Sequence, residues 1–482
     1  MRVVLISTYE LGRQPFGLAS PSAWLSQAGA EVTCMDLAVE RLDEGAIRAA
    51  GLVAFYLPMH TATRLVVPLI ERIRRLNQGA HIVCYGLYAP MNEKYLRGLG
   101  VDTILGGEYE AGLSSLVTRL MANGSIPRAA AQPEPTISLA RQQFITPQRA
   151  GLPPLSQYAQ LDMGQNQRRI VGYTEASRGC KHVCRHCPIV PVYEGMFRVV
   201  QKDVVLEDIR QQVRAGAAHI TFGDPDFFNG IGHALPIVRS LHAEFPQLTY
   251  DVTIKIEHLL QHAEHLPTLR DTGCLFVTSA IESIDEKVLA RLDKGHTQAD
   301  IIRVIHQFQE VGLTLNPTLV TFTPWTTLDG YRRLLAFLDE YELVENMGSI
   351  HLAIRLLIPA GSKLLDLPEV QSLVGPFDEQ LLIYPWQNSD PSVDQLHQEV
   401  LALVEAGAAR GEERREVFNQ VAALVELPMR QANGRHPRAQ VPHLTEPWYC
   451  CAEPTEEQLA PLYGERIKEW SGQLVGTPVP EI

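Results

Sequence analysis

Short apolar runs alternate with amphipathic stretches through the first quarter of the chain. The runs have the length of buried strands and fall at residues 3–6, 32–35, 52–57, 82–85 and 103–105. The stretches between them have helical periodicity, as at residues 61–76, and Ser20-Pro21 supplies a helix start. These βα units predict a doubly wound parallel sheet over residues 1–123. No GxGxxG follows the first run, which disfavours a dinucleotide site.

A second βα series follows a change in pattern. Prolines among scattered alanines and glutamines at residues 124–168 indicate a linker, partly extended over a neighbouring domain. From residue 169 to 365 the expected strands are 170–173, 219–222, 250–256, 275–280, 314–321 and 350–357. Helices are expected near 204–215, 231–244, 260–271, 285–292, 298–312 and 328–341. The repeats predict a partial (β/α)6 barrel, whose functional residues gather at the carboxyl ends of the strands.

Residues 366–482 are expected to form a helical C-terminal extension. Charged helices are predicted at residues 393–406 and 412–424, and the pattern breaks at 434–443. The pair Cys450-Cys451 comes next, just before Thr455-Glu456-Glu457-Gln458, which has the spacing of a capping box at a helix start. The fold class is therefore α/β with a helical extension that carries two adjacent cysteines.

Composition narrows the function. The chain has 482 residues with a formal net charge of −13, which argues against a general affinity for nucleic acid or anionic membranes. No apolar stretch reaches the roughly 18 to 20 residues that span a bilayer, and the first apolar run is too short for a signal peptide. A cytoplasmic enzyme with a small-molecule substrate is the expectation.

Three of the eight cysteines form a motif directly after the first expected barrel strand. Cys180, Cys184 and Cys187 lie on one short loop, and three such thiolates can hold three irons of a [4Fe–4S] cube while the fourth iron stays open. An open metal position is a substrate site. The alternative is a zinc site completed by His182 or His186.

The CxxxCxxC loop resembles that of the radical S-adenosylmethionine (SAM) superfamily. The resemblance implies that the open iron chelates SAM, and that one electron, from a donor such as flavodoxin or ferredoxin, breaks a carbon–sulfur bond to release a carbon radical. The residue before the third cysteine is usually aromatic in that family. Here it is His186, which can stack on adenine or act as a ligand.

Further segments resemble the superfamily in order and position. Gly223-Asp224-Pro225-Asp226 stands where relatives bind the SAM ammonium, with Asp224 as the best acceptor and Asp226 beside it. Glu282 and Ser283 resemble an element that binds the ribose or amino acid part of SAM. Arg355 is expected to face the SAM carboxylate or to form an outward salt bridge. Three candidates for the substrate site depend on strand register, namely Lys255, Asn316 and Thr318.

A doubly wound domain before such a barrel resembles the cobalamin-binding domains of the B12-dependent subfamily, including the turn Gly106-Gly107-Glu108-Tyr109-Glu110. The cobalt-ligand motif Asp-x-His-x-x-Gly of those domains is absent after the first expected strand. We therefore favour a structural domain over a site for cobalamin, and leave cobalamin open as a cofactor.

The tail Cys450-Cys451-Ala452-Glu453-Pro454 resembles a radical SAM family named for a Cys-Cys-Ala-Glu-Pro ending, in which some members carry selenocysteine at the position of Cys451. The resemblance implies a reactive thiol. Two adjacent thiols suit a thiophilic atom such as arsenic, or the reduction of a radical intermediate. Glu453 is a candidate for proton transfer or a helix cap. The alternative is that both cysteines are inert.

One branch of this tail family resembles an enzyme of arsinothricin biosynthesis, which implies transfer of the 3-amino-3-carboxypropyl group of SAM to trivalent arsenic held by Cys450 and Cys451. Two alternatives stay open. One is cobalamin-dependent methyl transfer or rearrangement by a radical SAM enzyme. The other is a sensor of metalloids or redox state that uses the cluster and the tail without turnover.

Overall fold

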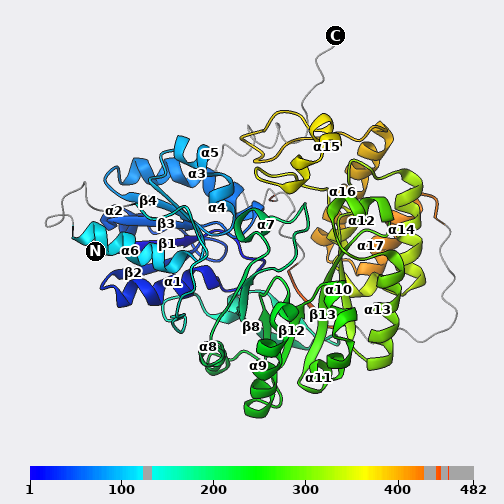
Figure 1. The fold of residues 1–482 in the computed structure, drawn as a ribbon, viewed down its shortest axis with the longest axis horizontal. Coiled ribbons are helices and arrows are strands. Elements are labelled where there is room, and N and C mark those ends of the chain that lie inside the picture. The colour runs from blue at the N-terminus through cyan, green and yellow to red at the C-terminus, as the bar shows by residue number, and fades with distance from the viewer. Residues whose placement is uncertain (123–132, 428–440, 447–453, 455–482) are drawn as a thin grey trace, which may run out of the picture.

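The computed structural model describes residues 1–122, 133–427, 441–446 and 454. Within them, two α/β units lie side by side, and helices of the C-terminal extension pack beside the second unit (Figure 1). No helix in these ranges is both long and apolar enough to cross a membrane. The predicted helix at Thr455 and the residues Cys450, Cys451 and Glu453 lie outside the described part of the chain.

The first unit is a parallel sheet in the order β2-β1-β3-β4-β5-β6. Its strands are β1 (Arg2–Ser7), β2 (Glu31–Asp36), β3 (Leu52–Tyr56), β4 (His81–Tyr85), β5 (Thr103–Gly107) and β6 (Ile137–Ser138). Both faces are covered, because Val4 and Ile6 of β1 pack into one core while Val3 and Leu5 pack into another. The predicted doubly wound sheet is confirmed.

Helices cover the two faces of this sheet in separate groups. Leu18 and Leu113 belong to the core that contains Val3, and Ile47 and Leu65 belong to the opposite core. The helices are α1 (Phe16–Gln27), α2 (Glu44–Ala49), α3 (His60–Leu76), α4 (Tyr88–Met91), α5 (Glu93–Gly98) and α6 (Tyr109–Met121). Because these strands pair in parallel, the carboxyl ends of β1, β3, β4 and β5 lie at one edge of the sheet. This edge faces the second unit.

The second unit is a curled sheet in the order β14-β13-β12-β11-β8-β7-β15. The strands β8 (Arg168–Thr174), β11 (His219–Phe222), β12 (Thr249–Thr253), β13 (Cys274–Glu282) and β14 (Thr314–Leu319) pair in parallel. Two short strands, β7 (Gln160–Asp162) and β15 (His443–Leu444), extend the sheet with antiparallel pairing. Residues of the expected linker thus join both sheets, through β6 and β7.

The prediction of a sixth barrel strand at residues 350–357 is wrong in detail. Its first part is the 3-10 helix η5 (Ser349–Leu352), and only one isolated bridge joins Arg355 to Phe322. A short buried apolar run has no period that separates a strand from a tight turn, which explains the error. The backbone still follows β14, since Phe322 N–H donates to the Ile354 carbonyl and Leu356 N–H donates to Phe322.

The barrel helices follow the predicted ranges with one division. The expected helix at 260–271 is split into α10 (Ile256–Gln261) and α11 (Leu266–Asp271), because Pro267 sits in the first turn of α11 and disfavours helix before it. The other helices are α7 (Val190–Tyr193), α8 (Lys202–Arg214), α9 (Ile231–Glu244), α12 (Glu286–Leu292), α13 (Gln298–Val311), α14 (Leu328–Glu340), α15 (Pro368–Leu373), α16 (Pro391–Arg410) and α17 (Arg414–Leu424).

Candidate metal centre

The three-cysteine loop leaves the barrel through a small antiparallel ribbon of β9 (Ser177–Gly179) and β10 (Phe197–Val199). Cys180 follows β9 directly, and its N–H donates to the Met196 carbonyl at 3.1 Å. Gly179 has φ of 75°, and a Cβ there would lie 2.4 Å from the ring of Tyr193. Glycine is therefore required where the chain turns into the loop.

The thiols of the loop fit an iron–sulfur cluster. Cys184 is buried, and the other two cysteines of the loop, Cys180 and Cys187, are half-buried. Burial, together with the neighbouring Cys184, raises the pKa of Cys180 to about 11 and that of Cys187 to about 12. The three thiols of this loop therefore interact electrostatically with one another. Iron accepts thiolate donors, and binding to a metal offsets the cost of deprotonating them.

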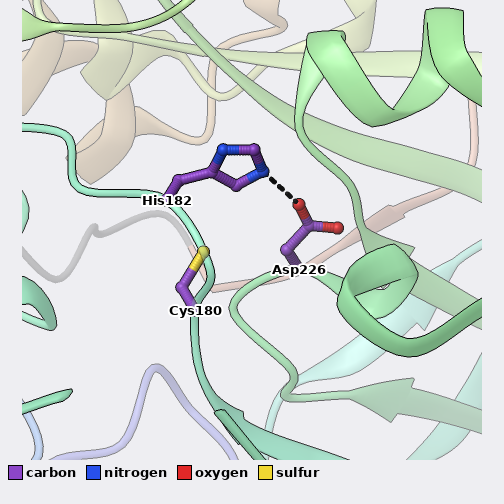
Figure 2. Close-up of side chains that lie close together, drawn as sticks. All are labelled: Cys180, His182 and Asp226. Carbon is purple, nitrogen blue, oxygen red and sulfur yellow. Dashed lines mark ion pairs between the residues drawn. The ribbon is translucent and has the colours of Figure 1, made fainter. Parts of the chain in front are cut away.

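One end of the loop meets an acid–imidazole group (Figure 2). Donor atoms of Cys180, His182 and Asp226 lie within 4.8 Å of one another, and His182 Nε2 is 3.5 Å from Asp226 Oδ2. The same carboxylate oxygen is 2.7 Å from Nδ1 of His258, on α10. Of the two histidines considered for a zinc site, His182 thus lies beside a cysteine, whereas His186 bonds to Glu282.

Hydrogen bonds fix the orientation of His182. The ammonium of Lys255 lies 3.1 Å from His182 Nδ1 and has only protons to donate, so Nδ1 accepts and Nε2–H faces Asp226. Burial raises the pKa of Asp226, but the two imidazoles outweigh it and hold that pKa below its usual value. Asp226 is therefore an ionised carboxylate beside Cys180.

The other end of the loop is held by Glu282. Its Oε1 lies 3.1 Å from His186 Nε2 and 3.4 Å from the ammonium of Lys294. Burial raises the pKa of Glu282, but Lys294 and His186 lower it overall to about 2. Glu282 also has φ of 65°, at an irregularity in the β13–β14 pairing. A non-glycine residue in this region marks a position at which the surrounding structure imposes strain, as functional sites often do.

Lys294 is a buried cation that the sequence did not predict as a site residue. Its side chain is 4% exposed, and its charge interacts with Glu282 and with the thiols of Cys184 and Cys187, which together raise its pKa despite burial. It follows the end of α12, and nothing in the local sequence distinguishes it from a solvated lysine. A positive charge here offsets the negative charge of thiolates and cluster.

Two further predicted residues, Asp224 and Ser283, have local partners. Asp224 accepts hydrogen bonds from Ala176 N–H at 2.8 Å and Ser177 Oγ at 2.6 Å, and burial raises its pKa to about 7. Ser283 Oγ accepts from the Asp285 N–H in the turn before α12. Asp224 thus lies against β9, and Ser283 lies beside Glu282.

Arg355 lies at the C-terminal extension. Its guanidinium pairs with Asp394 of α16 at 2.7 Å, donates to the Trp386 carbonyl, and lies 3.6 Å from the centroid of the Trp386 ring. Of the two expectations for this residue, the structure shows the salt bridge.

Strand register places two of the three substrate-site candidates, Asn316 and Thr318, toward the barrel interior. Val277 packs into the outer core, so its neighbour Thr278 faces inward, and Asn316 pairs with Thr278. Asn316 Nδ2 donates to Thr278 Oγ1 at 3.2 Å. Thr318, two positions further along β14, therefore faces inward too, and its Oγ1 is buried without a hydrogen-bond partner among the described residues. Lys255, the third candidate, follows β12, and its ammonium lies 3.1 Å from His182 Nδ1.

Comparison with known proteins identifies this unit. The family model described as the radical SAM superfamily matches residues 174–332. This part of the chain belongs to the radical SAM superfamily of enzymes. The superfamily implies a [4Fe–4S] cluster and SAM as cofactors, which agrees with the thiol donors of the loop.

Two curated relatives are distant. The chain is 23% identical over 333 residues to a hopanoid C-3 methylase of Methylococcus capsulatus, a match covering 65% of this chain and 62% of that protein. It is also 23% identical over 177 residues to the ribosomal protein uS12 methylthiotransferase RimO of Syntrophotalea carbinolica, covering 35% and 39%. Both matches span less than two thirds of the relative's length.

Solved structures show the same fold over more of the chain. The cobalamin-dependent radical SAM enzyme OxsB, with aqua-cobalamin and SAM bound, superposes with a TM-score of 0.68 at 13% identity, over 88% of this chain and 71% of that one. The radical SAM methyltransferase TsrM of Kitasatospora setae, with cobalamin and a [4Fe–4S] cluster bound, gives 0.60 at 18% identity, over 78% and 79%. These likenesses confirm the α/β fold class.

Buried side chains line the carboxyl edge of the first sheet, where cobalamin would be expected to bind. Tyr9, Glu10, Tyr56 and Tyr85 at this edge are each at most 6% exposed. The rings of Tyr56, Tyr85 and Tyr109 pack with centroids 5.0 to 6.1 Å apart. Protein side chains thus occupy this edge, which supports the interpretation of the first unit as a structural domain.

Proposed function

We propose that Cys180, Cys184 and Cys187 hold a [4Fe–4S] cluster, that SAM binds at its open iron, and that the chain uses them to make a carbon radical. The observation that carries the proposal is the placement of the three interacting thiols on one loop at the carboxyl end of the barrel. When bound and reduced, the cluster supplies the electron that breaks a carbon–sulfur bond of SAM.

The chain's own residues prepare this site. Glu282 holds His186, the charge of Lys294 lies near the thiols of Cys184 and Cys187, and Lys255 orients His182. Asp226 and Glu282 are ionised acceptors at opposite ends of the loop, and we propose them for the SAM ammonium and ribose. Asp224 has both oxygens engaged by Ala176 and Ser177 at the start of β9, so we propose that it acts by holding that strand.

The specific reaction we favour is transfer of the 3-amino-3-carboxypropyl group of SAM to a thiophilic substrate such as trivalent arsenic. Its support is the adjacent pair Cys450 and Cys451, whose thiols suit a soft atom, with Glu453 close by in sequence for proton transfer. The inward polar wall of Asn316 and Thr318 offers hydrogen bonds to an aminocarboxypropyl group.

The test is anaerobic reconstitution with iron and sulfide, followed by reduction in the presence of SAM, with and without arsenite. Mass spectrometry that detects 5′-methylthioadenosine and an arsenic-bound aminocarboxypropyl product supports the favoured reaction. Release of 5′-deoxyadenosine instead directs the search to organic substrates. SAM that binds but is never consumed supports the sensor.

Two variants separate the cluster from the tail. Cys184→Ala should abolish iron loading, because one of three cluster ligands is removed. Cys451→Ser should load iron normally and lose the arsenic product. Unchanged product formation by the second variant contradicts a catalytic tail. Cys34→Ser, at a cysteine of the first sheet, is the matched control.

Cobalamin-dependent methyl transfer is the second candidate, because the structures of OxsB and TsrM superpose over most of the chain. The closed edge of the first sheet argues against it. Titration of the purified protein with hydroxocobalamin decides between them: a stoichiometric change in the cobalamin absorption spectrum supports this candidate, and an unchanged spectrum excludes it.

A further inference from the structure

A buried arginine connects the two units immediately before the cysteine loop. Arg178 lies in the middle of β9, two residues before Cys180, and is 6% exposed. Its guanidinium contacts three carboxylates: Glu175 from its own unit, and Glu108 and Glu110 from the turn that follows β5. A buried arginine with partners from both units is a specific link between them.

The contact with Glu110 is bidentate. Nη2 lies 2.6 Å from Glu110 Oε1 and Nη1 lies 2.9 Å from Oε2, while Nε is 2.6 Å from Glu175 Oε2. The rings of Phe16, Tyr109 and Phe144 surround the guanidinium at 5.1 to 5.6 Å from their centroids. Water is thus replaced by aromatic faces and carboxylates, so the geometry of Arg178 is determined by protein groups.

The acidic turn is itself held in place by other parts of the chain. Gly107 has φ of 69°, and a Cβ there would lie 2.2 Å from the carbonyl oxygen of Ser138 in β6. Glu108 accepts a hydrogen bond from Tyr193 OH at 3.1 Å, and Glu110 accepts one from Ser20 Oγ at 2.7 Å. The turn is therefore a preformed acceptor for the guanidinium rather than a free loop.

The position of Arg178 determines where the cysteine loop begins. Arg178 pairs with Arg198 across the β9–β10 ribbon, and Gly179 pairs with Phe197. The next hydrogen bond along the ribbon is made by the Cys180 N–H. Only Gly179 lies between the arginine and the first thiol, so the backbone segment that the Arg178 ion pairs hold leads directly into Cys180.

We propose that Arg178 and the Glu108–Glu110 turn are positioning residues for the cluster, so that the first unit completes the metal site of the second. The inference rests on the proposed cluster at Cys180, Cys184 and Cys187. It gives the N-terminal domain a role of its own: its acidic turn receives an arginine from the barrel and fixes the first cluster ligand.

The test compares Arg178→Lys and Glu110→Gln with the wild-type chain. Lysine keeps the charge and glutamine keeps the shape, but neither preserves the bidentate ion pair. We expect both variants to fold and to lose iron to a chelator about tenfold faster after reconstitution, in the range seen when partners of metal ligands are removed. The EPR spectrum of the reduced cluster should change as well, in the absence and presence of SAM.

The control is Glu244→Gln. It removes an equally bidentate but exposed ion pair between Glu244 of α9 and Arg210 of α8. It should match the wild-type chain in iron loss and EPR spectrum. Circular dichroism and thermal unfolding before reconstitution establish that the variants are folded. Wild-type iron loss and spectrum in both folded variants overturn the inference. Failure of the wild-type chain itself to assemble a cluster instead overturns the proposed function.

Discussion

At Glu282, a single carboxylate stabilises the fold and orders the candidate site. It bonds to His186 beside the third cysteine and to Lys294, and its side chain is only 9% exposed. A buried acid of this kind depends on its partners, because an unpaired buried charge costs several kcal/mol. The sequence predicted Glu282 as a site residue from its resemblance to the superfamily. The sequence could not reveal Lys294, since the two residues meet only when the chain folds back after α12.

Replacing Lys294 by Met should destabilise the cluster-free protein by about 3 kcal/mol, because Glu282 then loses its buried counter-charge. Urea denaturation gives the free energy of unfolding. The double variant Glu282→Gln, Lys294→Met should recover part of the loss, since no uncompensated charge remains. Arg210→Met, at an exposed pair, serves as control and should change stability by less than about 1 kcal/mol. Equal losses in the single and double variants would contradict the buried pair.

Asp224 gives a prediction about pH. Burial raises its pKa to about 7 in the folded chain, whereas an unfolded chain has the ordinary value of 3.8. The folded state therefore holds the proton more tightly, so the stability associated with this group is present below about pH 4 and is lost as the pH rises through about 7. Asp224→Asn removes the dependence.

We therefore expect the free energy of unfolding of Asp224→Asn to rise relative to the wild-type chain between pH 4 and pH 8, by a few kcal/mol at about 1.4 kcal/mol per unit of pKa difference. Denaturation curves at several pH values measure it. A constant difference between the two proteins across this interval would show that Asp224 does not titrate in it.

At the scale of elements, periodicity located the long strands and helices and missed the shortest pieces. The residues 3–6 and 219–222 were predicted as strands because apolar runs of that length are buried on both faces in a parallel sheet. The strands β6, β7 and β15 contain two or three residues, too few to show any period. The sixth barrel strand failed for the related reason that η5 buries the same kind of residues as a strand.

The β9–β10 ribbon leads to a prediction about Gly179. Alanine at this position should prevent correct formation of the loop, because its Cβ would lie 2.4 Å from the Tyr193 ring and 2.5 Å from the Met196 carbonyl oxygen. The control is Gly312→Ala at the end of α13, where φ is similarly positive at 79° and no atom lies within 4 Å of the added Cβ.

Backbone strain alone should cost Gly312→Ala about 1 kcal/mol. Gly179→Ala should be destabilised by clearly more and should bind little iron after reconstitution. Denaturation curves and iron analysis of both proteins check this. Comparable stability and comparable iron in the two variants would show that the close approach to Tyr193 is not required.

At the scale of the whole molecule, the contact between the two units joins residues that are remote in sequence. Tyr158 OH donates to Asp36 at 2.9 Å, and Arg149 contacts both units. No local pattern marks either residue, because their roles depend on how two separately predictable domains meet. The sequence indicated that the segment around Arg149 extends over a neighbouring domain. In the structure, Arg149 contacts both units, through Gln14 of the first and Asp208 of the second.

Arg149 leads to a prediction about cooperativity. Its guanidinium donates to both carboxylate oxygens of Asp208 at 2.7 and 2.8 Å, to the Tyr173 carbonyl, and to Gln14 Oε1 in the first unit. Its side chain is 8% exposed and that of Asp208 is 1% exposed. Arg149→Met leaves the buried Asp208 without a counter-charge and removes the link to Gln14. We expect a loss of about 3 kcal/mol in the free energy of unfolding.

The more informative outcome is the shape of the thermal transition. Units joined by such buried contacts unfold together, whereas weakened coupling allows each to unfold at its own temperature. Differential scanning calorimetry should therefore resolve two transitions for Arg149→Met, while Arg210→Met, at a pair within the second unit, keeps the profile of the wild-type chain. A single transition at the wild-type temperature for Arg149→Met would mean that the units are coupled through other contacts, and the ion pair between Arg178 and Glu110 would be the next to remove.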